Sequence, residues 1–207
     1  MEGLLLVVSG PSATGKGTVC KKLVEETDVK LSVSATTREP RPGEVDGVDY
    51  FFMTEEEFVK TIEEDGFIEH VQNFGKRYGT PLSYVKSELS SGRDIILEID
   101  VQGAAIIKEK LPECILIFLL PPSLEELGER IRRRGTETKE KIDQRLSKAQ
   151  QEIECIVNYD YYIVNKEVEQ AVEDMKSIIK AEHHKLCKDL SEEIINSFKE
   201  EKTDALS

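Results

Sequence analysis

The chain has 207 residues, enough for one compact domain with smaller insertions and a sizeable buried core. Its 28 basic and 41 acidic residues give a formal net charge of −13, which argues against non-specific binding to nucleic acids or acidic membranes. The 4 cysteines lie far apart, with no CxxC pair and no Cys/His metal spacing, so reduced thiols are expected. Because no basic signal region and no apolar run of membrane-spanning length is found, the sequence predicts a cytoplasmic protein.

Residues 4–18, LLLVVSGPSATGKGT, carry the first functional motif. The apolar residues 4–8 predict a strand buried on both faces, and a helix is expected over residues 16–26. Gly10 and Gly15 lie five residues apart with Lys16 directly after, as in a phosphate-binding loop. Glycines let backbone N–H groups converge on phosphate oxygens, and the helix N-terminus attracts the same anion. Lys16 is therefore predicted to bind the β- and γ-phosphates of a nucleotide.

One position departs from this pattern. Gly17 follows Lys16 where Ser or Thr usually holds Mg²⁺, so that Thr18 carries the hydroxyl one residue later. A glycine turn without function is the alternative, and the flanking strand and helix argue against it. The loop residues expected to bind ATP are Gly10, Pro11, Ser12, Ala13, Thr14, Gly15, Lys16, Gly17 and Thr18.

The pattern of buried strands is interrupted after a second short strand, predicted at residues 31–34. Residues 35–49 are polar and rich in Pro and Gly, without a regular period. A strand at residues 50–53 follows, then a helix that opens with a capping box at residues 54–57, then a hairpin over residues 67–80. Residues 35–82 are therefore predicted to form a small mixed α/β insertion.

The buried-strand pattern then returns, with predicted strands at residues 94–100, 114–120 and 161–164 that alternate with helices. Five such strands predict a doubly wound five-stranded parallel sheet, which binds ligands at the carboxyl ends of its strands. The sequence divides into a core of residues 1–34, 83–123 and 149–187, the insertion at residues 35–82, an arginine-rich helical segment at residues 124–148, and a charged tail at residues 188–207. The tail is expected to be a weakly held helix or a frayed end.

Several further motifs follow the phosphate loop in order: SVSATTREPRPGEVDGVDYFF, FIEH, RYGTP, ILEIDVQG, LPPS and RGTET. Together they resemble guanylate kinases of bacterial type over about residues 4–165. The resemblance implies a P-loop kinase fold in which residues 35–82 bind GMP and residues 124–148 form a helical lid. It also implies the reaction ATP + GMP = ADP + GDP in purine nucleotide metabolism, with Mg²⁺ as cofactor, small-molecule partners only, and no nucleic acid or membrane. The oligomeric state stays open.

The resemblance implies that cationic side chains bind the phosphate of GMP and that a carboxylate binds its base. Arg38 and Arg41 match phosphate-binding arginines in a loop stiffened by prolines, where guanidinium groups bind phosphate oxygens in pairs. Glu69 matches the glutamate that accepts hydrogen bonds from N1–H and N2–H₂ of guanine. Because adenine lacks these paired donors, such a site would select GMP over AMP. The full set implied for GMP is Ser34, Arg38, Arg41, Tyr50, Glu69, Tyr78, Gly79, Thr80, Glu98 and Asp100.

Glu98 and Asp100 lie two residues apart on one face of an otherwise apolar predicted strand, where two like charges are costly without nearby cations or donors. A structural ion pair is the alternative to a functional role. The resemblance implies that Asp100 lies near Mg²⁺, directly or through water, and that Glu98 lies toward guanine. Thr18 and Asp100 are thus the expected metal-site residues, and Mg²⁺ needs no larger acidic cluster.

The resemblance also implies that arginines of the lid close over the phosphates, and that Asn165 lies beside the adenine. The residues expected to take part in catalysis are Lys16, Arg38, Arg130, Arg134 and Arg145. No general base is expected, because a phosphate monoester with a second pKa of about 6 is already largely a dianion. Catalysis would then rest on positioning and on charge stabilisation.

Two other functions remain open from the sequence. Guanylate-kinase-like modules of scaffold proteins bind peptides, but they typically lack a working phosphate loop, whereas this chain keeps Lys16. A kinase for another nucleotide is suggested by GKGT at residues 15–18, which is also familiar from adenylate kinases. The motifs of the insertion argue against that second alternative.

Overall fold

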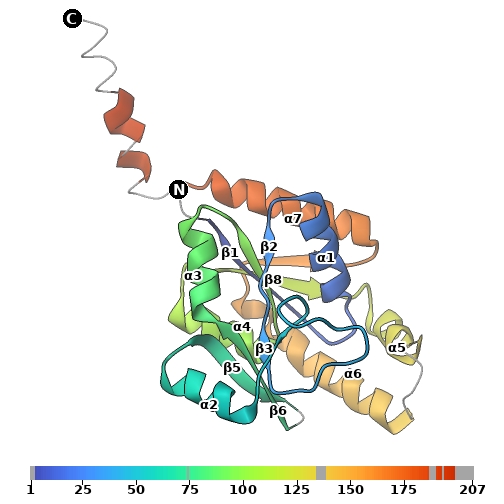
Figure 1. Ribbon diagram of the computed structural model, residues 1–207. Helices are drawn as coiled ribbons and strands as arrows, with labels where there is room; N and C mark the ends of the chain where they lie inside the picture. The colour runs from blue at the N-terminus through green and yellow to red at the C-terminus, as the bar shows by residue number, and fades with distance from the viewer. Residues whose placement is uncertain (1–2, 74, 134–138, 187–189, 193, 199–207) are drawn as a thin grey trace, which may run out of the picture.

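The computed structural model describes residues 3–73, 75–133, 139–186, 190–192 and 194–198 (Figure 1). Its larger sheet is parallel throughout and has five strands. Their order across the sheet is β2 (Lys30–Leu31), β7 (Ile95–Glu98), β1 (Leu5–Ser9), β8 (Ile115–Leu120) and β9 (Tyr161–Val164). The predicted five-stranded parallel sheet is confirmed.

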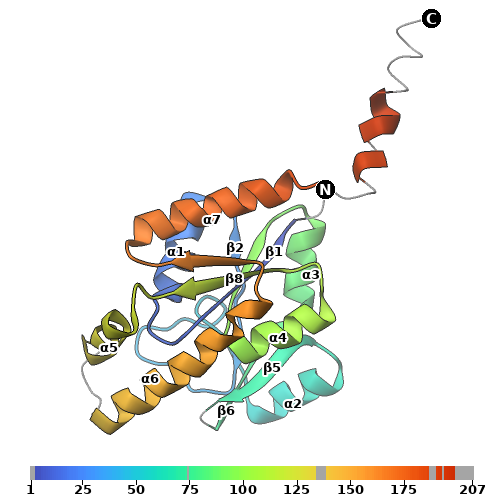
Figure 2. The same cartoon turned by 180° about the vertical axis from the view of Figure 1, so that it is seen from behind.

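Helices cover both faces of this sheet, as a doubly wound fold requires. α1 (Lys16–Glu26) and α7 (Val168–His183) pack on one face, and α3 (Leu82–Ser90) and α4 (Val101–Lys110) pack on the other. Figure 2 shows α7 running along the outside of the molecule. Successive side chains of β1 point to opposite faces, so Leu6 and Val8 are buried against one helical layer and Leu5 and Val7 against the other. This double burial explains the uninterrupted apolar run in the sequence.

The insertion forms a second, smaller sheet with one helix packed on it. The strand order is β4 (Phe51–Phe52), β3 (Ala35–Thr36), β6 (Lys76–Pro81) and β5 (Phe67–Asn73); β3 and β4 are parallel, and the other two pairs are antiparallel. α2 (Glu55–Glu63) begins at the predicted capping box, in which Thr54 Oγ1 accepts from the Glu57 N–H and Glu57 Oε2 accepts from the Thr54 N–H. Phe58 of α2 stacks on Phe67, with ring centroids 4.4 Å apart, and this pair forms the core of the insertion.

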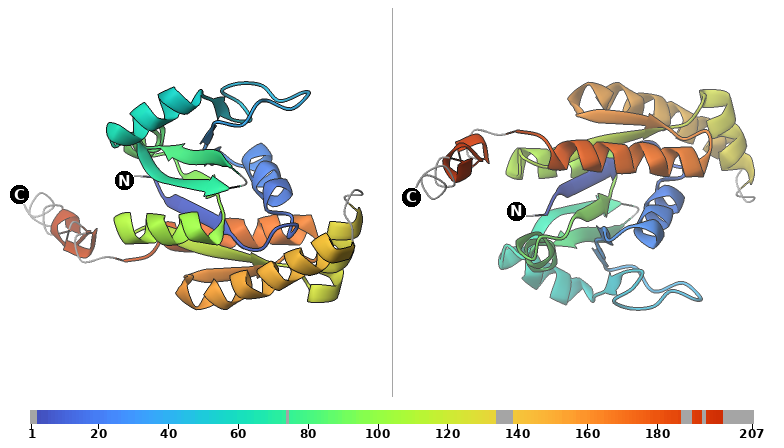
Figure 3. Two further views of the ribbon diagram at one scale, coloured as in Figure 1. Left: turned by 90° about the horizontal axis from the view of Figure 1, so that it is seen from below. Right: turned by 90° about the horizontal axis from the view of Figure 1, so that it is seen from above.

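The arginine-rich segment contains α5 (Leu124–Arg133) and the start of α6 (Lys139–Glu154), after which η1 (Cys155–Asn158) leads into β9. Apolar side chains of α5 and α6 pack on Ala13 of the phosphate loop. Figure 3 shows these helices and the small sheet on opposite sides of the loop and α1. In the tail, residues 190–192 and 194–198 are helical. In the part of the chain that the structure describes, no helix has the length and hydropathy to cross a bilayer.

The strand predicted at residues 31–34 is wrong as a single element. β2 ends at Leu31 and β3 begins at Ala35, and the two strands belong to different sheets. The Ser32 N–H still donates to Ile96 O of the large sheet (2.8 Å), whereas Ser34 O accepts from the Phe51 N–H of the small sheet (2.9 Å). The chain crosses from one sheet to the other within these residues, so that Ser34 lies at the junction.

The strand predicted at residues 94–100 is too long. β7 ends at Glu98, and α4 begins at Val101. The reason is local: Asp100 Oδ1 accepts from the Gln102 N–H (3.1 Å) and from the Gly103 N–H (2.9 Å), which makes Asp100 the N-cap of α4. Glu98 and Asp100 therefore do not share the face of one strand.

Candidate active site

The loop between β1 and α1 has a backbone that only small residues permit. A Cβ on Gly10 would lie 2.3 Å from Leu119 O, and Gly15 has φ of 91°, in the left-handed region. Ala13 also has a positive φ, 67°, and is held there by its packing against α5 and α6. α1 begins at Lys16, directly after the loop, so the N–H groups of its first turn are available to an anion.

The side chain of Lys16 contacts the backbone of this loop. Its Nζ donates to Gly10 O (2.6 Å) and to Pro11 O (3.1 Å). Burial lowers the pKa of Lys16, while the carboxylates of Glu98 and Glu152 act in the opposite direction. The ammonium group is thus held by two backbone carbonyls of the loop in which phosphates would bind.

A cleft of about 340 Å³ opens between the loop, the small sheet and α6. It brings together eleven of the residues that the sequence predicts for the site: Gly10, Ser12, Lys16, Ser34, Tyr50, Glu69, Tyr78, Gly79, Glu98, Asp100 and Arg145. These residues come from seven separate parts of the chain. The cleft therefore joins a phosphate-binding loop to the surface of the insertion.

Glu69 of β5 is a carboxylate buried at the insertion side of this cleft, with 3% of its surface exposed. Thr80, on the neighbouring strand β6, donates its hydroxyl to Glu69 Oε1 at 2.8 Å. Burial raises the pKa of Glu69 to about 7, and the Thr80 hydrogen bond lowers it only in part. A carboxylate in this state is poorly solvated, and paired N–H donors of a ligand would supply the hydrogen bonds that water does not.

Glu98 lies on the loop side of the cleft. A Cβ on Gly17 would come 3.3 Å from Glu98 Oε2, so the carboxylate faces the start of α1. Glu98 is exposed to the cleft, but protein surrounds it on its other sides; this partial dehydration raises the pKa of its carboxyl, and Lys16 opposes the effect. The space beside Gly17 would be filled by the Ser or Thr of the usual loop pattern.

Glu98 and Asp100 form a donor set that suits Mg²⁺, which takes one or two carboxylates and keeps several waters. Both hydrogen bonds from α4 go to Asp100 Oδ1, so Oδ2 takes no part in the cap. Among the described residues, no group of three or more His, Cys, Asp or Glu side chains is placed to hold a metal. Two carboxylates at the end of β7 are compatible with a hydrated Mg²⁺ that is held mainly through its nucleotide.

Arg38 is paired rather than free. Its Nη2 donates to Glu44 Oε1 at 2.9 Å, and its guanidinium carbon lies 5.3 Å from the ring centroid of Tyr50. Hydrogen bonding to Glu44 raises the pKa of Arg38 and lowers the pKa of Glu44. Arg41 is exposed, and its backbone N–H donates to Glu44 Oε2 at 2.7 Å. Glu44 thus orients the loop that carries both arginines.

A second cavity, of about 390 Å³, lies on the other side of the phosphate loop, and Thr18, Arg130 and Asn165 are among the residues that line it. Asn165 is buried; its Nδ2 donates to Thr14 O at 2.8 Å, and its Oδ1 has no hydrogen-bond partner. Arg130 donates from Nη1 to Thr14 O (3.3 Å) and from Nη2 to Asn165 O (3.1 Å). α5 is therefore already fastened to the loop.

The structure does not bring Thr18 and Asp100 together. Thr18 lines the second cavity and Asp100 lines the cleft, because each further residue of a helix turns the side chain by about 100°. Pro11 and Thr14 are hydrogen-bonded to each other inside the loop, where the Thr14 hydroxyl donates to Pro11 O at 2.9 Å. Arg134 lies outside the described residues.

Sequence reasoning missed three residues of the site: Glu44, Lys148 and Glu152. Lys148 and Glu152 line the cleft from α6 with their ion pair at 3.6 Å, and Glu152 is buried. Their spacing from Arg145, three and seven residues, places all three on one helical face and could have indicated them. Glu44 has a weaker signal, because nothing in a Pro- and Gly-rich loop fixes which arginine a glutamate will reach.

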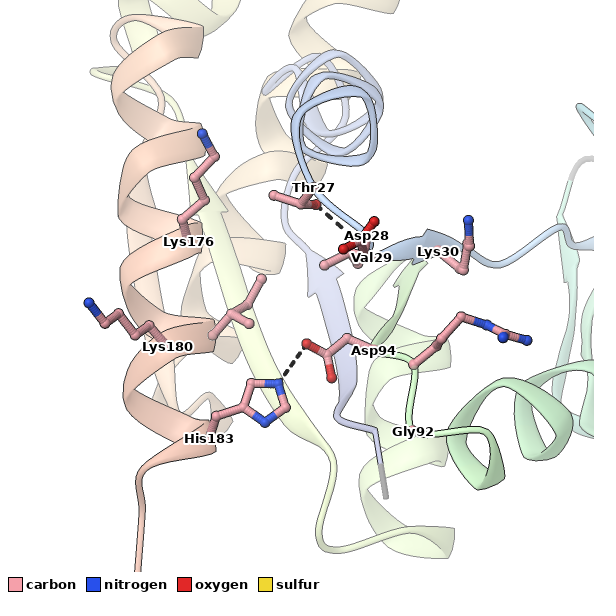
Figure 4. A pocket seen from close by; sticks show the side chains of 11 residues that line it. Thr27, Asp28, Val29, Lys30, Gly92, Asp94, Lys176, Lys180 and His183 are labelled. Atoms are coloured by element: carbon pink, nitrogen blue, oxygen red, sulfur yellow. Dashed lines mark hydrogen bonds and ion pairs between the residues drawn. The ribbon is translucent and has the colours of Figure 1, made fainter. Parts of the chain in front are cut away.

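A larger cavity, of about 550 Å³, lies at the opposite, amino end of the sheet strands (Figure 4). There His183 of α7 points toward Asp94, with Nε2 2.8 Å from Asp94 Oδ2, while Asp94 Oδ1 accepts from the Leu4 N–H. Two of its cations, Lys176 and Arg93, are paired with glutamates. We assign the active site to the smaller cleft, since that cleft has the phosphate loop and lies at the carboxyl ends of the strands.

The chain is similar to known proteins over nearly its whole length. A family model described as "Guanylate kinase" matches residues 2–182. The chain is 50% identical over 207 residues to a guanylate kinase of Oceanobacillus iheyensis, covering 100% of this chain and 98% of the relative. It is 52% identical over 201 residues to a guanylate kinase of Clostridioides difficile, covering 97% and 98% of the two chains. A crystal structure of guanylate kinase from Anaplasma phagocytophilum matches with a TM-score of 0.75 at 37% identity, covering 90% of this chain and 89% of that one.

Proposed function

This chain belongs to the guanylate kinase family, and from that premise we propose that it transfers the γ-phosphoryl group of ATP to GMP, giving ADP and GDP. The observation that carries the proposal is the buried carboxylate of Glu69 in the same cleft as Lys16 of the phosphate loop. One end of the cleft suits a base with paired N–H donors, and the other suits phosphates. Such a reaction serves purine nucleotide metabolism and the recycling of GMP, and we place it in the cytoplasm.

In this proposal GMP binds between the insertion (residues 35–82) and the core. Glu69 accepts from N1–H and N2–H₂ of guanine, with Thr80 holding Glu69 and Ser34 adding a hydroxyl. Arg38, Arg41, Tyr50 and Tyr78 bind the phosphate. Adenine offers no such donor pair at its Watson–Crick edge, so AMP would leave the carboxylate buried without partners, which is costly.

ATP binds along the phosphate loop with its adenine beside Asn165. The unpartnered Oδ1 of Asn165 supports this placement, because the 6-amino group of adenine would supply the missing donor. A guanine base presents an oxygen at that position and would leave Oδ1 facing an acceptor. The site therefore favours ATP over GTP as the phosphoryl donor.

Glu98 and Asp100 would hold Mg²⁺, directly or through water, on the loop side of the cleft. Mg²⁺ would supply charge neutralisation for the phosphates when it is bound. Thr18 lines the second cavity rather than this cleft.

The residues of the chain catalyse by position and charge. GMP arrives largely as a dianion because its second phosphate pKa is about 6, and no general base is required. Lys16 leaves the carbonyls of Gly10 and Pro11 for the phosphates, and Arg145 approaches from α6 as the lid (residues 124–148) closes. Closure holds the acceptor and donor oxygens in line and excludes water, which would otherwise hydrolyse ATP.

A coupled assay of ADP release with ATP and each of GMP, AMP, CMP and UMP tests the proposal. GMP should support rapid release, and the other three should support little. Rapid release with AMP instead would identify a kinase for another nucleotide. No release with any of the four would contradict an enzyme and favour a peptide-binding module.

A further inference from the structure

Glu69, the residue that the proposed function assigns to guanine, touches the core at a glycine. A Cβ built on Gly103 of α4 would lie 3.2 Å from Glu69 Oε2 and 3.5 Å from its carboxyl carbon. Gly103 is buried in the first turn of α4, where its N–H donates to Asp100 Oδ1 at 2.9 Å. Helix interiors disfavour glycine, so its presence at this contact needs a reason other than helix formation.

The carboxylate of Glu69 has little freedom to move away from this contact. On one side, the Thr80 hydroxyl holds Oε1 at 2.8 Å. On the other, Lys110, at the far end of α4, donates from Nζ to Ile68 O at 2.6 Å and fastens strand β5 next to Glu69. α4 therefore holds strand β5 in place through Lys110, while Gly103 leaves room for the side chain of Glu69.

We infer that Gly103 is a positioning residue for selectivity: the missing side chain at this point allows Glu69 Oε2 to take the place from which it reads the base of the nucleoside monophosphate. The inference rests on the proposed function and deepens it. A methyl group at residue 103 would force the pinned carboxylate to shift by a few tenths of an ångström, because 3.2 Å is shorter than an ordinary contact. Two hydrogen bonds that must form together with guanine N1–H and N2–H₂ are sensitive to such a shift.

The test is Gly103→Ala, with steady-state kinetics for GMP and AMP at saturating ATP and for ATP at saturating GMP. We expect KM for GMP to rise by roughly tenfold, KM for ATP to stay within about twofold, and the preference for GMP over AMP to shrink. A loss that falls equally on KM for ATP would overturn the inference, and so would an unchanged kcat/KM for GMP. Calorimetric titration with GMP alone provides a readout that does not depend on phosphoryl transfer.

Gly128→Ala is the matched control, because Gly128 is also a helical glycine. There a Cβ would lie 3.6 Å from Leu146 Cδ1 and 3.7 Å from Arg132 Nη2, which are ordinary contacts. The control should keep the affinity for GMP and raise the melting temperature slightly, since alanine favours a helix.

A double-mutant cycle separates an effect through Glu69 from a general disturbance of α4. In a Glu69→Gln background, which already lacks the carboxylate, adding Gly103→Ala should change kcat/KM for GMP by less than about twofold. A full additional tenfold loss there would show that residue 103 acts by another route, and the inference would fail.

If Gly103→Ala lowers the melting temperature, the double variant Gly103→Ala/Glu69→Asp shows whether the contact with Glu69 is the cause. Aspartate is one methylene shorter, so Gly103→Ala should leave the melting temperature of the Glu69→Asp variant unchanged; a fall as large as in the wild type would rule out the contact as the cause. A wild-type protein without GMP-dependent ADP release would defeat the proposed function. An active wild type whose Gly103→Ala variant keeps its GMP preference would defeat only this inference.

Discussion

The phosphate loop and the pocket around Glu69 lie in one cleft but are built in opposite ways. The loop is a single contiguous stretch, residues 10–16, whose shape depends on local backbone angles and on glycines at fixed positions. The pocket is assembled from β5, β6, α4 and the junction at Ser34, which are brought together only by packing of the insertion against the core.

The two regions also differ in electrostatics. Burial lowers the pKa of Lys16 at the loop and raises the pKa of Glu69 in the pocket, so each buried group is held in an environment that disfavours its charge. A ligand with phosphates at one end and paired N–H donors at the other would relieve both costs. In the proposed function, the loop supplies affinity for any nucleotide, whereas the pocket selects the base.

The largest expected effect concerns the loop. Lys16→Ala should lower kcat for phosphoryl transfer from ATP to GMP by roughly 10²–10³-fold while the fold is retained, because the variant removes the cation that stabilises charge on the transferring group. The measurement is coupled ADP release together with far-ultraviolet circular dichroism. Lys21→Ala, an exposed lysine on the same helix, is the control and should be silent. A variant that keeps wild-type kcat would remove Lys16 from the mechanism.

The next largest effect distinguishes a contact with the base from a contact with the phosphate. Glu69→Gln loses a charge-assisted pair and should cost on the order of 2–4 kcal/mol in kcat/KM for GMP, with a smaller loss for IMP and AMP. Arg41→Ala should instead weaken all three monophosphates by a similar factor, because a phosphate carries no information about the base. The measurement is kcat/KM for GMP, IMP and AMP in both variants. If Glu69→Gln kept the full GMP-to-AMP ratio, the base site would have been placed wrongly.

The raised pKa of Glu69 predicts a pH dependence of stability without ligand. Its folded pKa of about 7 lies above the ordinary value of 4.5, so its stabilising contribution is complete below pH 4.5 and is lost as the pH rises through 7. Above pH 7 the buried charge should cost on the order of 3 kcal/mol. Glu69→Gln should therefore stabilise the protein against urea more at pH 8 than at pH 5.

Comparing the two proteins at each pH cancels the other titrating groups, so the change in the difference reports on Glu69 alone. An equal difference in unfolding free energy at pH 5 and pH 8 would contradict a raised pKa. For the same reason KM for GMP should rise in the wild type as the pH falls below about 7, since the protonated carboxyl accepts poorly from guanine.

The smallest effect tests whether the insertion is merely a support for Glu69. Thr54→Ala removes the N-cap of α2 and should cost about 1 kcal/mol of unfolding free energy, with kcat unchanged at saturating GMP. The measurement is urea unfolding alongside the coupled assay. Thr61→Ala, on the same helix, removes a hydroxyl that donates to Glu57 O and should be neutral or slightly stabilising. A large fall in kcat for Thr54→Ala would mean that α2 contributes to catalysis.

Elements that depend on neighbours in the chain could be predicted from the sequence. The last strand, Tyr161–Val164, the helix Lys16–Glu26 and the capping box of Thr54 and Glu57 all have the predicted bounds, because apolar periodicity and side-chain caps act over a few residues. The errors occur where a distant partner decides. Residues 31–34 look like one strand, yet Ile96 O draws one end to the large sheet and Phe51 draws the other to the small sheet.

By itself the sequence determined the phosphate loop, the alternation that makes a doubly wound sheet, and eleven of the residues that line the cleft. Only the tertiary structure decided the partners of each charged side chain: Arg38 pairs with Glu44, Glu98 faces the start of α1, and Glu69 contacts Thr80 and Gly103. It also placed Thr18 in a different cavity from Asp100. The physical reason is the distance along the chain over which each interaction acts. Backbone angles and caps are set by adjacent residues, whereas the dehydration and pairing of a charge depend on how separate elements pack around it.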